Sequence, residues 1–519
     1  MPPRVTDGRA RPRFLAGLLY LVVPPLKPFL KQTLGRNERI WRKLRTIRDR
    51  HMVGPSMPVG LEAPFTRRLY AAWFHLLGPA SRVVLKNTLG RNRWMWGKLR
   101  AVHNRLIHGS PQRGALPRAV TGNVQPVDGH PRPFGVNVAG YLNSEKGTGE
   151  AARSAIAMLK AANVPLVLNN IIDSSSVNNE TEFTDFSDEN PYAFNLVCVS
   201  ADQAANFAWH KGGTYFQGRH NIGLWNWELA SFPEEWLPCL QYFDEIWVPS
   251  NFVLNVLSPV SPIPVLRFPY SVRPESDRRD DLERSRFGLS NEHFFFLFMF
   301  DFHSFFERKN PLGLIEAFKR AFRKDDDVVL VIKSVHADTQ AVRAMREAAK
   351  QTNVKVTDTV LSRQEVNALY HLCDCYVSLH RSEGFGLTLA EAMRSAKPVI
   401  GTAYGGNTDF MTPENSYPVK YKLIEIDRDH GPYKKGSVWA DPELDHATEL
   451  MRHVYENREE ARAIGWKARE DILRLLHPRV VGDSMKQRLL TIASLKEITV
   501  PSLEDTADQT TIFSTREAM

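Results

Sequence analysis

The segment from residue 375 to residue 401 limits the possible folds of this 519-residue chain more than any other. Cys375-Tyr-Val-Ser-Leu379 and Pro398-Val-Ile-Gly401 are short apolar runs, typical of buried strands, and a helical pattern lies between them. Strands that are joined through a helix run parallel, because a parallel pair needs a crossover connection. The sequence therefore predicts an α/β fold with a parallel sheet covered by helices.

The loop between the first of these strands and the helix has the composition of a ligand-binding loop. Residues 382–391 read Ser-Glu-Gly-Phe-Gly-Leu-Thr-Leu-Ala-Glu. Gly384 and Gly386 permit positive φ and a close approach of a ligand to the backbone, and N–H groups at the start of a helix attract an anion. Glu383 and Glu391 are then free to accept hydrogen bonds from hydroxyls, which suits a sugar joined to a phosphate. Alternatively, both glutamates are solvated charges near a helix end.

This loop closely resembles the donor-site signature of the family-four retaining glycosyltransferases, the GT-B-type glycosyl transferases group 1 of the kind that build bacterial polysaccharide or lipopolysaccharide. The matching run is Glu-Gly-Phe-Gly-Leu-Thr-Leu-Ala-Glu-Ala, with seven residues between Glu383 and Glu391. The resemblance extends roughly from Phe134 to Leu490. It implies two Rossmann-like domains that face a cleft, a nucleotide-sugar donor as substrate, and no metal or other cofactor.

The resemblance also implies a role for each residue of the loop. Glu383 would contact the hydroxyls of the donor sugar as part of the catalytic group, and Glu391 would bind the ribose. The main-chain amides that would bind the sugar and the phosphate are those of Gly384, Phe385, Gly386 and Leu387.

The second domain is expected to open with seven apolar residues, Phe294-Phe-Phe-Leu-Phe-Met-Phe300, which suit a strand covered on both faces. Arg308 and Lys309 follow in a loop that enters a helix from Leu312 to Phe322. Two cations near a helix N-terminus are disfavoured unless an anion binds there. The resemblance implies that Lys309 binds the donor diphosphate, and Arg308 is either a second catalytic contact or a surface cation.

One departure from the family pattern is Asp301, because relatives commonly carry an arginine soon after this strand. The missing charge could come from Arg308, or from Lys333 at the end of the strand Val328-Val-Leu-Val-Ile332, since strand ends in such sheets point into the cleft. Alternatively, the chain is catalytically silent and binds sugar nucleotide or glycan as a scaffold at a membrane.

The first domain is expected to open with the strand Phe134-Gly-Val-Asn-Val-Ala-Gly-Tyr141, followed by Gly147, Thr148 and Gly149 at the start of a helix. A glycine pair at such a junction can cradle a phosphate or an acceptor, although turns of this kind are also common connectors. Its position fits the acceptor side of the cleft.

Two tryptophans and a glutamate close a later strand of the first domain. Trp225 and Trp227 offer flat faces that can pack on sugars, and Glu228 can accept hydrogen bonds from hydroxyls, so the three are acceptor-side candidates. The alternative for the tryptophans is core or domain-interface packing.

The resemblance implies a retaining transfer in which negative charge grows on the departing diphosphate. Lys309, Arg308 or Lys333, and the helix amides would stabilise that charge. Glu383 would position the sugar rather than attack it, unlike the carboxylates of glycoside hydrolases.

Basic charge is concentrated in residues 1–135, where 25 Lys and Arg face 5 acidic residues, although the whole chain carries only +9. Residues 30–45 and 85–100 agree at 11 of 16 positions, so this region contains two copies of one module. A basic helix with a Trp and Leu stripe is typical of one lying on an anionic membrane surface. Alternatively the stripes pack on each other or on the catalytic domains, or the region is an anionic-surface or nucleic-acid binder, although no specific nucleic-acid motif accompanies it.

The predicted domains follow from these features. They are a basic helical tandem repeat over 1–130 with copies at 13–45 and 68–100, an acceptor-side Rossmann-like domain over 134–275, a donor domain over 285–475, a C-terminal helix over 476–496 that could cross back to the first domain, and a disordered tail over 500–519. Cysteines without a disulfide or zinc spacing favour a reducing compartment. We therefore expect a cytoplasmic protein, peripheral to the inner face of the plasma membrane, that transfers sugar to a glycan or lipid-linked acceptor in cell-surface polysaccharide synthesis.

Overall fold

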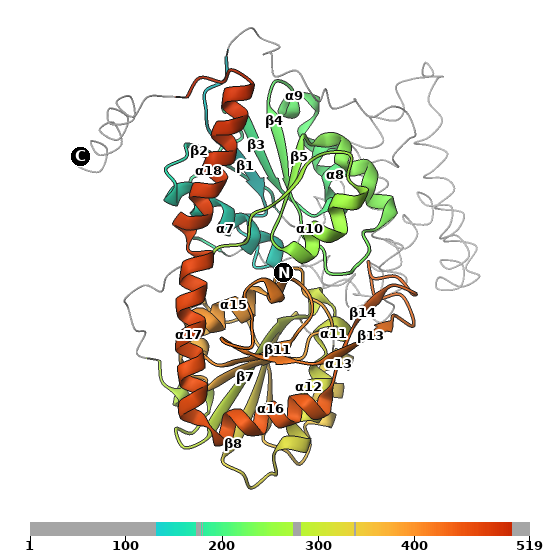
Figure 1. Cartoon of the computed structure of the whole chain (residues 1–519), viewed down its shortest axis with the longest axis vertical. Coiled ribbons are helices and arrows are strands. Elements are labelled where there is room, and N and C mark those ends of the chain that lie inside the picture. The colour runs from blue at the N-terminus through green and yellow to red at the C-terminus, as the bar shows by residue number, and fades with distance from the viewer. Residues whose placement is uncertain (1–130, 173–177, 179, 273–281, 337–338, 501–519) are drawn as a thin grey trace, which may run out of the picture. The chain divides into compact units, whose positions relative to one another are not determined.

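The computed structural model describes residues 131–172, 178, 180–272, 282–336 and 339–500 (Figure 1). The predicted basic repeat at 13–45 and 68–100 and the tail from residue 501 onward lie outside these residues. Within the described part of the chain, no helix combines the length and the apolar composition needed to cross a membrane.

The first domain is built on a six-stranded sheet in which every neighbouring pair of strands is parallel. In spatial order the strands are β2 (Leu166–Asn170), β1 (Val136–Gly140), β3 (Phe194–Cys198), β4 (His220–Leu224), β5 (Glu245–Val248) and β6 (Val265–Arg267). β1, β3, β4 and β5 are buried along their whole length, as expected for the central strands of a parallel sheet that is covered on both faces.

The second domain repeats this plan with another six-stranded parallel sheet. In spatial order its strands are β12 (Tyr417–Val419), β11 (Val399–Thr402), β10 (Cys375–Ser378), β7 (Phe294–Asp301), β8 (Val328–Val335) and β9 (Val354–Asp358). The predicted strand over 294–300 lies within β7, at the middle of the sheet. A separate antiparallel hairpin is formed by β13 (Tyr421–Glu425) and β14 (Val438–Pro442).

Helices connect the strands of both sheets. In the first domain they are α7 (Gly147–Ala161), α8 (Ala201–Lys211), α9 (Gly213–Phe216) and α10 (Asn251–Leu257), with 3-10 helices η2 (Glu234–Tyr242) and η3 (Ser258–Val260). In the second they are α11 (Phe306–Lys309), α12 (Pro311–Ala321), α13 (Thr339–Ala348), α14 (Arg363–Leu372), α15 (Leu387–Arg394), α16 (Leu444–Glu456) and α17 (Arg458–Leu476), with η4 (Arg284–Phe287), η5 (Phe302–Ser304) and η6 (Gly406–Asp409).

The last helix, α18 (Pro478–Leu495), returns to the first domain and lies along α7 (Figure 1). Lys486 Nζ donates to the carbonyl of Ala162 at 3.0 Å, beyond the C-terminal end of α7. Arg488 reaches Glu245 of β5, where Nη2 and Oε2 are 2.5 Å apart. The chain therefore enters the second domain after β6 and leaves it again through α17.

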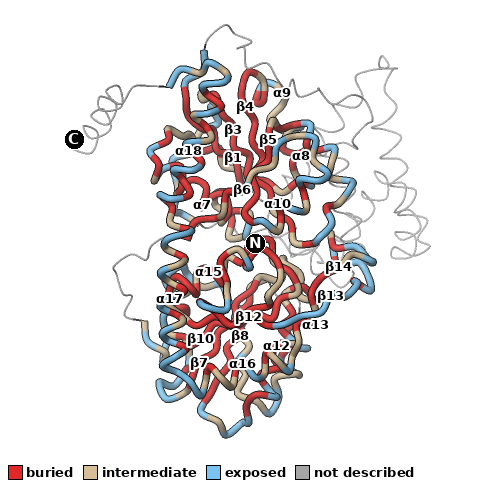
Figure 2. The backbone as a smooth tube through the Cα atoms, viewed as in Figure 1, coloured by how far each residue is buried: buried red, intermediate tan, exposed pale blue. Residues whose placement is uncertain are grey.

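Burial follows the two sheets, whose central strands form the interior of each domain, while the edge strands β6 and β9 contain no buried residue (Figure 2). All four cysteines are free and buried, so they contribute to the core rather than to covalent links. The predicted α/β fold with two Rossmann-like domains is confirmed by this topology.

Candidate active site

Glu383, in the loop after β10, lies between the two cations expected to contact the donor. Lys309 Nζ donates to Glu383 Oε1, and Arg308 Nη1 lies 3.2 Å from Oε2. The side chains of Arg308, Lys309 and Glu383 are only 4%, 12% and 13% exposed. The three residues therefore form a mostly buried group with one excess positive charge.

The two cations lie in the single turn of α11, and not in the loop that the sequence predicted. Asn310 ends this turn in the left-handed conformation, with φ of 51°, and its Oδ1 accepts from Gly313 N at 3.3 Å to begin α12. Its amide nitrogen also donates to the carbonyl of Leu379 at 3.0 Å. Arg308 Nη1 donates to the carbonyl of Ser382 at 2.7 Å. The C-terminal end of α11 is therefore fastened to the loop of residues 379–386 between β10 and α15, which we call the donor loop.

Burial and charge act in opposite directions on the pKa values of this group. Burial would raise the pKa of Glu383, but the positive charges of Lys309 and Arg308 outweigh it and lower the pKa to about 2. Burial lowers the pKa of the Lys309 ammonium and the charge of Arg308 lowers it further, and together they outweigh the opposing effect of the Glu383 and Glu228 carboxylates. Glu383 is therefore held as a carboxylate, suited to accept hydrogen bonds from hydroxyls.

His380 is a neighbour of this group that the sequence interpretation missed. Its Nδ1 lies 3.1 Å from Ser378 Oγ, and its Nε2 lies 3.2 Å from both the Tyr404 carbonyl and Asn407 Oδ1. Burial lowers the pKa of His380 to about 4, so the imidazole is neutral near pH 7. Its side chain fixes the loop after β11 against the end of β10.

The donor loop leads into α15 through two glycines, and each position requires glycine for a different structural reason. Gly386 has φ of 91° and precedes Leu387, the first residue of α15. A Cβ at Gly384 would overlap Asn226 Oδ1 and lie 2.6 Å from the carbonyl oxygen of Trp227. Gly384 is therefore required by the close approach of the first domain, and Gly386 by its backbone angle.

Phe385 is buried, and its ring lies 5.1 Å from that of Tyr270 in the first domain. Ser250 Oγ, at the start of α10, donates to the Gly384 carbonyl at 2.6 Å. Both contacts cross from one domain to the other, so the first domain helps to set the conformation of the donor loop.

Glu391 lies one turn inside α15, where other residues already hold its carboxylate. Tyr370 Oη donates to Oε2 at 2.9 Å, and Arg363 Nη1 lies 3.4 Å from Oε1. Arg363 also donates to Glu150 on α7 of the first domain. A ribose at Glu391 would therefore meet an arginine that links the two domains.

Lys333, at the carboxyl end of β8, interacts with Asp301, Asp358 and Glu145 rather than with Glu383. Burial lowers the pKa of its ammonium, and these carboxylates oppose the effect. Because Glu145 precedes α7, Lys333 faces the first domain, which is the direction that the strand-end argument predicts.

One group among the described residues could hold a metal ion. Asp301, His303 and His336 each offer a ligand atom, and these atoms lie within 4.8 Å of one another. Asp301 Oδ1 is 3.1 Å from His336 Nδ1 and 3.6 Å from His303 Nδ1. The nearby ammonium of Lys333 adds a positive charge that disfavours a divalent cation at this place.

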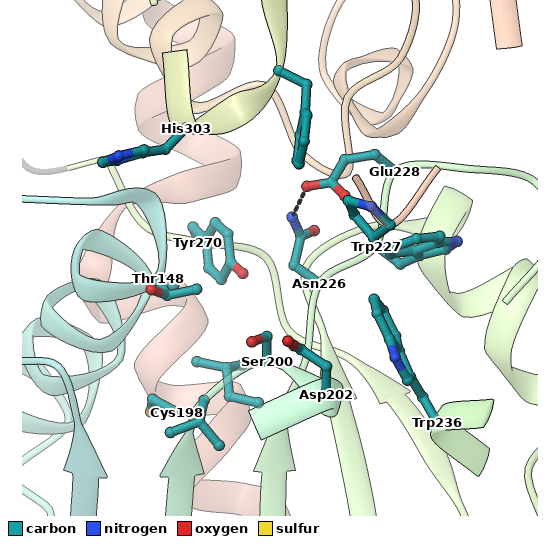
Figure 3. A pocket seen from close by; sticks show the side chains of 15 residues that line it. Thr148, Cys198, Ser200, Asp202, Asn226, Trp227, Glu228, Trp236, Tyr270 and His303 are labelled. Atoms are coloured by element: carbon teal, nitrogen blue, oxygen red, sulfur yellow. Dashed lines mark hydrogen bonds between the residues drawn. The ribbon is translucent and has the colours of Figure 1, made fainter. Parts of the chain in front are cut away.

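A cavity of about 520 Å³ lies at the carboxyl ends of the first-domain strands, facing part of the second domain (Figure 3). It is lined by Thr148, Ala151, Cys198, Val199, Ser200, Asp202, Leu224, Asn226, Trp227, Glu228, Trp236, Tyr270, His303, Phe305 and Pro432. Three predicted acceptor-side residues, Thr148, Trp227 and Glu228, are among them.

Glu228 connects this cavity to the charged group around Glu383. Its Oε1 accepts from Asn226 Nδ2 at 3.2 Å, and its Oε2 accepts from Tyr433 Oη at 3.2 Å. The guanidinium of Arg308 lies over the ring of Tyr433, 5.9 Å from its centre. Ser382, next to Glu383, donates to the Glu228 carbonyl.

The remaining acceptor-side candidates lie outside the cavity lining. Trp225 is 1% exposed and stacks on Phe232 at 6.0 Å, which is the packing role given as the alternative for the tryptophans. Gly149 is buried, where a Cβ would overlap the Ser144 carbonyl, while Gly147 is exposed at the start of α7. Asp202, Asn226, Trp236 and Tyr270 line the cavity without having been predicted, because their positions depend on contacts between distant segments.

Comparison with known proteins matches the second domain to a family. Residues 281–471 match the family described as Glycosyl transferases group 1. Trehalose synthase of Pyrococcus horikoshii is 26% identical over 172 residues, which are 32% of this chain and 36% of that protein. The chain thus spans little more than a third of the length of this relative.

Two solved structures share the fold at low identity. HepE of Anabaena, in complex with UDP and glucose, matches with a TM-score of 0.51 and 11% identity, covering 69% of this chain and 100% of HepE. Sucrose-phosphate synthase of Thermosynechococcus elongatus matches with a TM-score of 0.50 and 14% identity, covering 70% and 100%. The chain therefore has the two-domain GT-B fold, and its residues 281–471 match the family described as Glycosyl transferases group 1.

Proposed function

We propose that this protein is a retaining glycosyltransferase that moves a sugar from a nucleotide-sugar donor to a glycan or lipid-linked acceptor in cell-surface polysaccharide synthesis. The observation that carries the proposal is the buried group formed by Arg308 and Lys309 of α11 and by Glu383 in the loop before α15. It combines a carboxylate for sugar hydroxyls with an excess positive charge for a diphosphate.

The group suits the departure of a diphosphate. In the transition state the bond between the anomeric carbon and the donor oxygen lengthens, and negative charge grows on that oxygen. Lys309 and Arg308 lie where they can stabilise this charge, and the free N–H groups at the start of α15 add to it. Because Glu383 is fixed by both cations, it orients the sugar and is poorly placed to act as a nucleophile.

In this mechanism the acceptor hydroxyl attacks the face from which the diphosphate leaves, and the leaving phosphate takes its proton. The cavity beside Glu228 supplies room for an acceptor, and the Glu228–Tyr433–Arg308 contacts connect it to the donor site. The anomeric configuration would then be retained.

The transfer is proposed to need no metal, because Lys309 and Arg308 supply the positive charge. Turnover in EDTA should equal turnover in buffer, and added Zn²⁺ or Mn²⁺ should not raise it. Loss of turnover in EDTA that Mn²⁺ restores would contradict this part of the proposal and direct attention to Asp301, His303 and His336.

The test of the function is a panel of UDP-, GDP- and dTDP-sugars. UDP-glucose is a reasonable first donor, since one structural neighbour was solved with UDP-glucose. Release of nucleoside diphosphate would be measured with and without glycan acceptors, and NMR would give the configuration of the new bond. An inverted product would refute the retaining mechanism, and binding without turnover would favour the scaffold alternative.

We further propose that residues 1–130 attach the protein to the anionic inner face of the plasma membrane. The support is the excess of basic residues and the tandem copies at 30–45 and 85–100. Sedimentation with vesicles containing anionic lipid, compared between the full chain and a chain lacking residues 1–130, tests this. Equal sedimentation of the two proteins would contradict it.

A further inference from the structure

The cavity at the carboxyl ends of the first-domain strands contains two buried polar atoms without a hydrogen-bond partner among the described residues. They are Thr148 Oγ1, at the start of α7, and Asn226 Oδ1, just after β4. The nitrogen of the Asn226 amide donates to Glu228, which leaves the carbonyl oxygen as the free group. Since buried polar atoms are normally paired, these two point to a ligand that supplies hydrogen-bond donors.

The charges around the cavity restrict that ligand further. Of the described residues that line it, Asp202 and Glu228 are acidic and none is lysine or arginine. Glu228 interacts with Arg308, so its charge is balanced by the donor site. Asp202 is exposed in the first turn of α8, and its recorded side-chain bond is with the neutral Gln203, at 2.8 Å. The helix dipole favours an acid there. Among the described residues, no lysine or arginine forms an ion pair with the Asp202 carboxylate.

The polar side chains lie on different sides of the cavity (Figure 3). Asp202 and Ser200 lie together near the end of β3, Thr148 lies beside Tyr270, and Glu228 lies on the side opposite Asp202. A ligand that contacts both Asp202 and Glu228 must therefore occupy the space between them, in the middle of the cavity.

An aromatic wall completes the cavity. Trp236, in η2, is partly exposed, and its ring meets that of Trp227 edge-on at 4.9 Å and 80°. This arrangement holds Trp236 in place and leaves ring surface for a ligand. Flat apolar surface beside a few fixed polar groups is the usual construction of a small-molecule site.

We propose that this cavity is the acceptor subsite and that it selects a sugar ring without an acidic substituent. Hydroxyls of the sugar donate to Thr148, Asn226 and Asp202, and the C–H face of the ring packs on Trp236. Asp202 is the residue that excludes uronic acids and phosphorylated ends by charge repulsion. The inference rests on the proposed function and names the acceptor class of that site.

The experiment compares octyl glucoside and octyl glucuronide as acceptors below their micelle concentrations, with the full chain and a donor that it hydrolyses. Competition for transfer gives the relative kcat/KM. We expect kcat/KM for the glucoside to exceed that for the glucuronide by about tenfold or more, which is the effect of one like-charge contact. Asp202→Asn should reduce the preference to about threefold or less, mainly through a lower KM for the glucuronide.

Glu235→Gln is the matched control, because Glu235 is an exposed acid in η2 that does not line the cavity. Its preference should equal that of the unmodified protein. Trp236→Ala should raise the KM of the glucoside, whereas Trp209→Ala, on an exposed part of α8, should not.

Equal or better use of the glucuronide by the unmodified protein would overturn the inference. An unchanged preference in Asp202→Asn, or failure of both glycosides to compete while a longer glycan is used, would also overturn it. Donor hydrolysis without acceptor separates this result from a failure of the proposed function: if no nucleotide sugar is bound or hydrolysed, the proposed function itself is wrong.

Discussion

At the scale of single residues, the candidate site depends on opposite charges that are buried together, away from water. Glu383 is paired with two cations, Lys309 and Arg308, and Arg308 also donates to the Ser382 carbonyl. Removing Glu383 would leave two buried cations without their carboxylate, and removing either cation would take away one of the two partners of Glu383. Substitutions here should therefore affect both activity and stability.

We predict that Lys309→Ala lowers kcat by about 100-fold or more, because an electrostatic contact to the leaving group is typically worth this much. Lys319→Ala is the control, since Lys319 is an exposed lysine of α12 that pairs with Glu316. Initial rates of nucleotide release give the ratio. Near-normal rates in Lys309→Ala, with circular dichroism unchanged, would remove Lys309 from the site.

A second prediction concerns acid. His380 has an ordinary pKa of 6.5 that burial lowers to about 4, and Glu383 has one of 4.5 that falls to about 2. In both cases the unfolded chain binds protons that the folded chain does not, so the free energy of unfolding should fall as pH falls. The contribution of His380 to the free energy of unfolding is lost as the pH falls from about 6.5 to about 4, and that of Glu383 is lost from about pH 4.5 to about pH 2.

Urea unfolding at pH 7.5 and at pH 5 measures the first of these effects. The loss of stability over this interval should be smaller in His380→Gln, which cannot gain a proton. An equal loss in both proteins would show that His380 does not titrate in this range.

At the scale of elements, the donor loop and α15 are positioned by close contacts that only glycine permits. Gly384 lies under Asn226 and Trp227, and the backbone of Gly406 approaches the carbonyl of Gly384 from the other side. Gly406 N also donates to the carbonyl of Glu383 at 2.7 Å. The loop is therefore held between the first domain and η6.

We predict that Gly384→Ala reduces kcat/KM for the donor by at least tenfold, because the added methyl group must displace Asn226 or the backbone of the first domain. Gly213→Ala is the control, since a Cβ there would meet no atom within 4 Å. Michaelis kinetics of both variants test this. Equal kinetics would show that the contact between the loop and the first domain is easily relieved.

The sequence predicts where strands and helices lie better than it predicts which residues contact one another. The apolar runs at 294–300 and 375–379 fall in β7 and β10, because period and burial are local properties. The pairing of Lys309 with Glu383 joins residues 74 positions apart, and the Ser250 bond to Gly384 joins residues 134 apart. Trp225 and Trp227 illustrate the same limit, since hydrophobicity could not tell that one is core and the other lines a cavity.

At the scale of the whole molecule, α18 fixes the end of the described chain to the first domain. Glu245 of β5 has a side chain only 1% exposed, and Arg488 of α18 is its cationic partner together with contacts from His220 and Trp247. Burial would raise the pKa of Glu245, but these partners lower it to about 2. The attachment of α18 to the first domain thus depends partly on the buried charge of Glu245 in β5.

We predict that Arg488→Met lowers the free energy of unfolding by about 3 kcal/mol, the lower end of the range for a broken buried ion pair. The lower end applies because Arg488 is partly exposed and because Trp247 still donates to Glu245. Arg479→Met, on the same helix, removes only an exposed pair with Asp483. Thermal unfolding compares them. A similar melting temperature for the two variants would contradict the prediction.

Arg363 is the residue that joins the donor side to α7, through Glu391 and Glu150. We predict that Arg363→Met enlarges the radius of gyration of the protein without donor, because it removes an ion pair between the domains. Arg320→Met is the control, since its partners Glu316 and Asp445 both lie in the second domain. Small-angle X-ray scattering of both variants gives the comparison, and equal radii would refute the prediction.

The route of the chain has a mechanical consequence. Val272, after β6, donates its N–H to the carbonyl of Leu476, at the end of α17, at 3.0 Å, so the outgoing and returning segments are joined side by side. Two chain connections held together at one place should restrict the relative movement of the domains more than a single linker does. A protease cut in the outgoing segment should divide the chain into two polypeptides that stay associated, because α18, in the second polypeptide, packs on α7 of the first. Nicked protein should therefore migrate as a single particle under native conditions and as two fragments under denaturing conditions.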